Sequence, residues 1–190
     1  SKPITKFSYK VKNEKEIKYI LEKAYHIATS GRPGPVLIDI PMDLQKKIIN
    51  PTKLKSFTYP LEKKINLKGK IKDIKKFFLN SKKPVIILGG GLNYSRSENL
   101  INKLLKKLKI PIVTTWSGCD LVDYNNSYYV GNIGVYGSRS ANFTVQNSDL
   151  IFCLGSRLDT RVTGGVPKNF ARNAYKIVVD IDEHELNKQR

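Results

Sequence analysis

Glycines and charged residues directly follow several short apolar runs in this chain, and they are the residues whose types could do chemistry. The first group is Gly89, Gly90 and Gly91, which follow the run 84–88. Because glycine lacks a Cβ, this turn lets the backbone approach a ligand, and amides that open a helix can face an anion. The triplet does not complete a G-x-G-x-x-G pattern, so a tight strand–helix turn without a ligand explains it equally well.

A second group follows the apolar run 150–154, in a loop bounded by glycines. It consists of Gly155, Ser156, Arg157, Asp159, Arg161 and Val162. An aspartate between two arginines can hold both rigid while their guanidinium groups face a phosphate or a flavin ring. An ion-pair cluster with a purely structural role is the alternative.

Two further groups have weaker patterns. Asp180 and Ile181 end the last apolar run, where an acidic residue typically accepts hydrogen bonds from ribose hydroxyls or an adenine amine. The motif Asp182-x-x-Glu185 alternatively begins the next helix. The loop 131–137 carries Gly134, Val135 and Tyr136, and the tyrosine ring either stacks on a planar ligand or packs inside the protein.

Self-contained catalysis is not expected from the remaining reactive residues. His26 lies within a predicted helix and His184 near the end of the chain, and neither has a Ser or Cys partner in a recognisable arrangement. Cys119 and Cys153 lack the spacing of a zinc site, and Cys153 lies in an apolar run, which predicts a buried side chain. No pair of carboxylates is framed as an acid–base couple.

The formal charge of +18 raises the question of nucleic acid, but the positive charge comes from 27 lysines and only seven arginines. Arginine is the usual residue for bidentate phosphate and guanine contacts, so we interpret the lysines as solvated surface and expect no nucleic-acid partner. A nucleic-acid binder would gather its lysines on one face. No apolar run is long enough to span a membrane and no signal peptide opens the chain, which predicts a soluble cytoplasmic protein without membrane contact.

The elements that position these residues fall into two parts. In the first, apolar spacing predicts a helix over 14–29, begun by Asn13 and ended by Gly31. The run 36–40 has the composition of a fully buried parallel strand, for which residues 1–10 supply at most one neighbour. We therefore expect residues 1–45 to be the tail of a larger domain and 46–68 to be a lysine-rich linker.

The second part, 69–190, alternates predicted strands and helices in the order of βαβ units. Strands are predicted at 84–88, 110–115, 150–154 and 176–181, and helices at 67–80, 97–108 and 140–147, with a loop-rich stretch from 116 to 137. This order predicts the α/β class, a parallel sheet flanked by helices. Ligands of such sheets bind at the carboxyl ends of the strands, where the glycines and charged residues lie.

Taken in order, these motifs resemble the acetolactate synthase (acetohydroxyacid synthase) large subunit branch of the thiamine-diphosphate enzymes. The segment Ala28–Pro41 looks like the end of that family's pyrimidine-binding domain. Lys83–Gly91 looks like the opening strand of its central domain, which has a DHS-like nucleotide-binding fold, and Gly155–Gly164 is similar to its G-x-R-F-D-D-R-x-T-G segment.

The resemblance implies that 69–190 is an FAD-binding-type central domain, truncated at its C-terminus. The flavin or ADP-type nucleotide would contact Gly89, Gly90, Gly91, Thr115, Trp116, Gly134, Val135, Tyr136, Gly155, Ser156, Arg157, Asp159, Arg161, Val162, Asp180 and Ile181. The chain departs from the family pattern at Val135-Tyr136, where Met-His is usual, and at Leu158 and Thr160. Related members keep this fold without FAD.

The resemblance also implies a full-length enzyme that uses thiamine diphosphate and Mg²⁺ to join or release acyl units of 2-oxo acids, in branched-chain amino acid biosynthesis. The catalytic glutamate and the Mg²⁺-binding segment have no counterpart here, so we expect no catalytic residue, no metal site and no activity in this chain alone. The expected partners are a small-molecule substrate and identical chains, as a dimer or tetramer. The alternatives are a flavin-free enzyme of sugar or cell-surface polysaccharide biosynthesis, and a stand-alone nucleotide-binding module.

Overall fold

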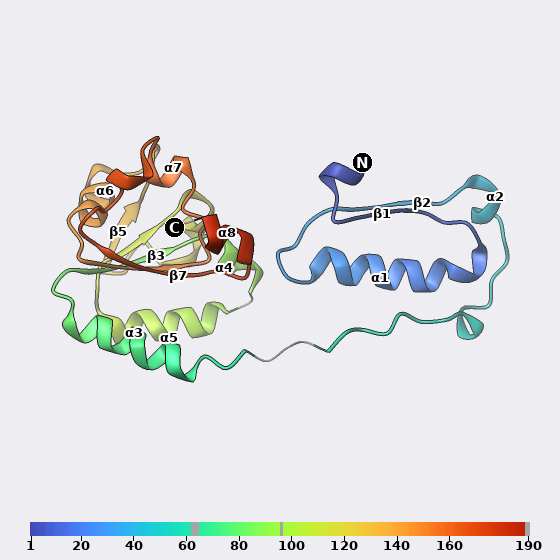
Figure 1. The fold of residues 1–190 in the computed structure, drawn as a ribbon, viewed down its shortest axis with the longest axis horizontal. Coiled ribbons are helices and arrows are strands. Elements are labelled where there is room, and N and C mark those ends of the chain that lie inside the picture. The colour runs from blue at the N-terminus through green and yellow to red at the C-terminus, as the bar shows by residue number, and fades with distance from the viewer. Residues whose placement is uncertain (62–64, 96, 189–190) are drawn as a thin grey trace. The chain divides into compact units, whose positions relative to one another are not determined.

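The computed structural model describes residues 1–61, 65–95 and 97–188, and it forms two compact units, Ser1–Ile65 and Asn66–Arg190. Figure 1 shows the helices and strands of both. The expected division into 1–45, 46–68 and 69–190 stays a prediction.

The first unit is a two-stranded parallel sheet with a helix packed on it. Its elements are η1 (Lys2–Ile4), β1 (Phe7–Lys10), η2 (Glu14–Glu16), α1 (Ile17–Thr29), β2 (Val36–Asp39), α2 (Met42–Gln45) and η3 (Pro51–Lys53). Asn13 and Glu16 form a capping box at the start of the helical segment, which confirms the predicted start. Val11, Ile20 and Ala24 are its buried apolar residues.

The second strand is only half-buried within this unit, whereas its composition predicts a strand that is fully buried in a larger domain. β2 is parallel to β1, as expected, but the burial of its residues alternates and the side chain of Leu37 is 42% exposed. The reason is that α1 covers one face of a two-stranded sheet, so alternate side chains have nothing in this unit to pack against. Part of the predicted linker also lies on α1, where the Phe57 ring packs against Tyr19 and His26.

The second unit is a three-layer arrangement with a five-stranded, wholly parallel sheet at its centre. The strands are β3 (Pro84–Leu88), β4 (Ile112–Thr114), β5 (Tyr129–Asn132), β6 (Leu150–Leu154) and β7 (Tyr175–Val179), in the order β5-β4-β3-β6-β7. The helical elements are α3 (Lys68–Asn80), α4 (Gly91–Tyr94), α5 (Glu98–Leu108), η4 (Trp116–Leu121), α6 (Arg139–Gln146), α7 (Thr160–Thr163), η5 (Pro167–Asn169) and α8 (Glu183–Lys188). The predicted α/β class with a parallel sheet is confirmed.

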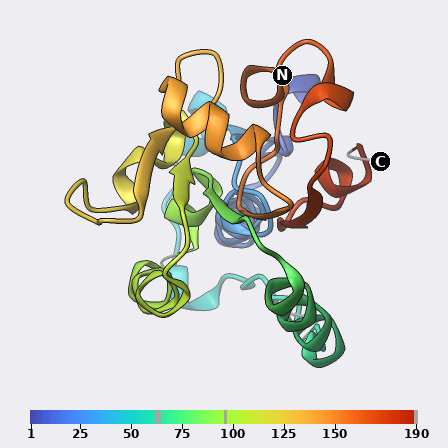
Figure 2. The same cartoon turned by 90° about the vertical axis from the view of Figure 1, so that its left-hand side faces the viewer.

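Successive side chains of β3 point to opposite faces of the sheet, and each face has its own hydrophobic core. Ile86 and Leu88 belong to the cluster beneath α3 and α5, whereas Val85 and Ile87 belong to the cluster beneath α6. Figures 1 and 2 both show α3 and α5 on one face and α6 on the other. This arrangement aims the carboxyl ends of all five strands at one edge, where α4 and α8 also lie.

Two elements of this unit differ from the prediction. β5 lies within the stretch expected to be loop, because this short edge strand contains Gly131 at φ +124° and is only half-buried. The helix after the glycine triplet begins earlier than expected, with the single turn α4 preceding α5. No helix in the described residues has the length and apolar character to cross a membrane.

Candidate nucleotide site at the carboxyl edge of the sheet

The loops after β3 and β6 meet at the carboxyl edge, at the point where the chain changes sides of the sheet. The N–H of Gly89 donates to the carbonyl of Leu154, and that of Gly91 donates to Gly155, both over 2.9 Å. A Cβ at Gly89 would lie 2.3 Å from the Gly155 oxygen, and one at Gly90 would lie 2.5 Å from the Ser117 Cβ. Close packing of neighbouring loops therefore requires these glycines whether or not a ligand binds here.

The loop after β5 is fixed by a side chain that sequence reasoning missed. Asn142 on α6 accepts a hydrogen bond from the Gly134 N–H at 2.9 Å and donates one to the Gly134 carbonyl at 3.0 Å. Gly134 has φ +98°, and a Cβ there would lie 2.4 Å from the Arg161 carbonyl oxygen, to which Val135 donates its N–H. A lone asparagine in an amphipathic helix gives no sequence signal for this role.

Aromatic side chains from two loops meet at this edge. Trp116, at the start of η4, and Tyr136, after β5, pack edge to face with ring centroids 5.1 Å apart and an interplanar angle of 71°. Their side chains are 64% and 74% exposed, and Val135 beside them is also exposed. Tyr136 is therefore not an internal packing residue in this structure. The preceding Thr115 is buried, and its N–H donates to the carbonyl of Leu88.

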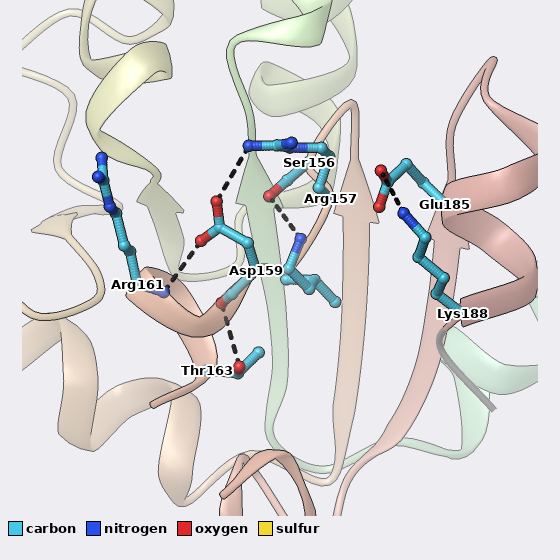
Figure 3. Close-up of polar contacts among 8 residues, drawn as sticks. Ser156, Arg157, Asp159, Arg161, Thr163, Glu185 and Lys188 are labelled. Carbon is cyan, nitrogen blue, oxygen red and sulfur yellow. Dashed lines mark hydrogen bonds and ion pairs between the residues drawn. The ribbon is translucent and has the colours of Figure 1, made fainter. Parts of the chain in front are cut away.

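The charged loop after β6 forms only half of the expected three-residue cluster. Arg157 pairs through its side chain with Asp159 at 3.2 Å, whereas Arg161 contributes its backbone N–H to the same carboxylate at 3.0 Å. Figure 3 shows the guanidinium of Arg161 directed away from Asp159. The expectation that Asp159 holds both guanidinium groups is thus wrong, because its second oxygen caps α7.

The backbone of this loop is tightly held by its own side chains. Ser156 is buried, and its hydroxyl accepts a hydrogen bond from the Leu158 N–H, while the Thr163 hydroxyl donates to the carbonyl of Asp159 (Figure 3). Leu158 adopts φ +50°, a left-handed conformation uncommon for a branched side chain. Val162 faces inward, against the core beneath α6. These contacts hold the loop through its own atoms.

The last strand leads to an acidic turn at the same edge. The Asp180 carboxylate accepts the N–H of Asp182, and the Asp182 carboxylate accepts the N–H of His184, so Asp182 caps α8 as the alternative interpretation expected. Ile181 is exposed between them. The carboxylate of Asp180 is thus engaged by the turn that holds it.

Groups able to receive an anion are present at this edge. The Arg161 guanidinium has no acidic partner, and the amides of Gly90 and Tyr136 have no acceptor, within the described part of the chain. Burial raises the pKa of Cys153 to about 12, which leaves a neutral thiol rather than a nucleophile. No group of three potential metal ligands occurs among residues 1–61, 65–95 and 97–188.

Fold and candidate site together define an α/β domain with a parallel sheet flanked by helices, whose loops gather at the switch point of the sheet. The sequence profile described as "Thiamine pyrophosphate enzyme, central domain" matches residues 71–190. The chain therefore belongs to the thiamine pyrophosphate enzyme family, and this stretch is its central domain.

Curated relatives extend the similarity to nearly the whole chain. The acetolactate synthase large subunit of Cyanidium caldarium is 39% identical over 99% of this chain, and that of Lactococcus lactis is 38% identical over 98%. The large subunit of acetolactate synthase isozyme 2 of Escherichia coli K12 is 34% identical over 98%. The chain spans about a third of the length of these relatives, namely 33%, 32% and 33%.

Proposed function

We propose that this chain is the portion of an acetolactate synthase-type carboligase that joins the end of the pyrimidine-binding domain to the central domain. Similarity to acetolactate synthase large subunits over at least 98% of the chain, including residues 1–65 outside the matched domain, supports this proposal. A stand-alone nucleotide module gives no reason for the first unit to share that similarity. The complete protein then forms acetolactate by joining acyl units of 2-oxo acids.

Thiamine diphosphate supplies the acyl-carrying chemistry of the complete enzyme. Its site, the Mg²⁺ that holds it, and the catalytic residues belong to parts of the enzyme other than this chain. Oligomerisation into a cytoplasmic dimer or tetramer, and a place in branched-chain amino acid synthesis, belong to the same proposal. The role of residues 66–188 is to scaffold and to bind a nucleotide.

We further propose that the carboxyl edge binds FAD, with the flavin or adenine ring against Trp116 and Tyr136. The observation that carries this is the exposure of two rings in contact with each other, since exposed aromatic faces at a ligand edge favour stacking with a planar group. The amides of Gly90 and Tyr136 and the guanidinium of Arg161 suit a diphosphate. The remaining predicted contact residues belong to the same loops, after β3, β4, β5, β6 and β7.

Trp116 is the chain's single tryptophan, so its fluorescence reports directly on this site. We expect FAD to quench it saturably and ADP to bind more weakly, because ADP lacks the isoalloxazine ring. Tyr136→Ala should weaken FAD binding at least tenfold. Tyr124→Ala is the matched control, because Tyr124 is also exposed but precedes the amino end of β5, and it should leave the affinity unchanged.

The outcome separates the proposed function from its alternative. Saturable ADP binding without preference for FAD, or no quenching by either, would favour a flavin-free enzyme of sugar or polysaccharide biosynthesis. Assay of the complete enzyme for acetolactate release tests the activity independently, and absence of this product would exclude the acetolactate synthase assignment while leaving the nucleotide site open.

A further inference from the structure

Lysines are unevenly distributed over the second unit. Eleven of the chain's 27 lysines lie between Lys68 and Lys109, against two acidic residues in that stretch, whereas 110–188 contains three lysines and eight acidic residues. The lysine-rich stretch comprises α3, β3 and α5, so its charge lies on one face of the sheet and along the amino edge. The lysines of this unit are thus concentrated in one stretch rather than scattered.

A hollow of about 510 Å³ lies at the amino edge, where this charge is concentrated. Lys82 and Lys83 line it from the turn before β3, and Lys109 lines it from the turn before β4. Pro84 and Pro111 form rigid walls, and Asn147 closes the side toward α6. We call this feature the lysine hollow. It faces away from the nucleotide-type loops, which occupy the opposite ends of the same strands.

Lys109 occupies a backbone position that does not favour lysine. It ends α5 in the left-handed conformation, with φ 47° and ψ 45°. Glycine or asparagine normally holds such a position, because a Cβ there crowds the following carbonyl oxygen. Lys109 lines the hollow from this strained position, which indicates a role for its side chain.

The three ammonium groups are available to a ligand. Within the described residues, none of them donates to a carboxylate or any other acceptor. The carboxylate at this edge belongs to Asp149, and it is engaged by the Ser81 hydroxyl and by the backbone N–H groups of Lys82 and Lys83 at 2.7 and 3.0 Å. The carboxyl ends of α5 and α6 add negative partial charge of about half a unit each. The positive charge of the three lysines exceeds the sum of these partial charges and the charge of Asp149.

We propose that the lysine hollow is a binding site for a small multivalent phosphate anion, such as the di- or triphosphate group of a metabolite. Lysine binds phosphate as a point charge, whereas planar carboxylates favour the arginine fork, and the charged residues that line the hollow are all lysines. Its volume is in the range of small-molecule sites, roughly 300–1,000 Å³. The excess of lysine on the adjoining face raises the local anion concentration. This site is independent of the proposed function.

Titration of the 190-residue chain with tripolyphosphate, by calorimetry at low and moderate salt, tests the proposal. The triple variant Lys82→Gln, Lys83→Gln, Lys109→Gln should weaken binding at least tenfold. The matched control is Lys103→Gln, Lys106→Gln, Lys107→Gln, which removes the same charge from the exposed side of α5 and should change the affinity less than twofold. Lys109→Gly should also weaken binding, by about threefold or more, without lowering the melting temperature, because glycine relieves the strained backbone.

Two outcomes overturn the proposal. The first is the absence of saturable binding by the unmodified chain at low salt. The second is an equal loss of affinity in both triple variants, which would mean that tripolyphosphate responds to a diffuse field rather than to the hollow. A parallel titration with duplex DNA distinguishes this second case. If the affinity for DNA also falls equally in both triple variants, the whole lysine-rich face is a polyanion surface instead.

Discussion

The N–H of Gly91 donates to the carbonyl oxygen of Gly155 over 2.9 Å, which joins the loops after β3 and β6 through backbone atoms alone. The two glycines follow β3 and β6, strands that are neighbours in the sheet but distant in sequence. The position of the charged loop, and hence of Arg161, therefore depends on the absence of side chains at this contact.

Substitution of Gly89 by alanine tests this contact. The new Cβ would lie 2.3 Å from the Gly155 oxygen, a backbone atom that cannot rotate away, so we expect Gly89→Ala to lower the free energy of unfolding by about 1–3 kcal/mol. Urea denaturation of the chain measures the change. Gly69→Ala is the control, because Gly69 lies in α3 and a Cβ there would meet no neighbouring group within 4 Å. Alanine should therefore stabilise that helix by about 0.5–1 kcal/mol. A neutral Gly89→Ala would show that the loops are not held this closely.

Asn142 is expected to hold the loop that carries Val135 and Tyr136. Asn142→Ala removes both partners of the Gly134 peptide, so it should cost about 1–3 kcal/mol of stability and accelerate exchange of the Gly134 amide hydrogen. Thr144→Ala on the same helix is the control, because its hydroxyl bonds only to the preceding turn, and it should change stability by less than about 0.5 kcal/mol. Equal exchange rates of the Gly134 amide in both variants would show that Asn142 does not hold this loop.

Asp149 should make the stability of the second unit depend on acidity. Partial burial raises the pKa of its carboxyl, but hydrogen bonds from Ser81, Lys82 and Lys83 outweigh this and leave the pKa below its ordinary value. The unfolded chain therefore binds a proton more readily, so the contribution of Asp149 is complete above about pH 4 and is lost as the pH falls through the folded-state pKa.

Asp149→Asn should accordingly lower stability at pH 7 and make it less dependent on pH between about 2 and 5. Thermal melts across this range provide the measurement. Asp73→Asn, at an exposed position on α3, is the control and should leave the acid profile unchanged. The interpretation fails if the Asp149→Asn variant and the unmodified chain lose stability in parallel.

The two thiols should react at different rates with an alkylating reagent. Cys119 is exposed, whereas Cys153 is buried in β6, where burial raises its pKa to about 12. At about pH 8 we expect rapid modification of one cysteine, located to Cys119 by peptide mass spectrometry, and modification of Cys153 only with denaturant. Rapid alkylation of Cys153 in the folded chain would mean that β6 opens readily.

Much of the second unit could be predicted from the sequence because buried parallel strands are short apolar runs that end in turn residues. The prediction gave β3 and β6 with the bounds that the structure has, since both are covered by helices on two faces. β5 was missed because an edge strand with Gly131 and polar neighbours lacks that pattern. β2 was predicted as a strand, but its burial could not be known without the number of its neighbours.

The candidate site was also predictable only in part. Sequence placed its residues at the carboxyl ends of the strands, because every strand of a parallel sheet ends on the same side. Which of them touch was not predictable, as with Trp116 and Tyr136, which come from different loops, and Arg161, which turns away from Asp159.

The glycine loops and their order along the chain are thus properties of the sequence, fixed by local turn chemistry and by the spacing of apolar runs. Tertiary structure alone decided that Gly89 faces Gly155, that Asn142 holds Gly134, and that Lys82, Lys83 and Lys109 surround one hollow. The physical reason is that these contacts depend on the order of strands in the sheet, which joins residues far apart in sequence through distances of a few ångströms.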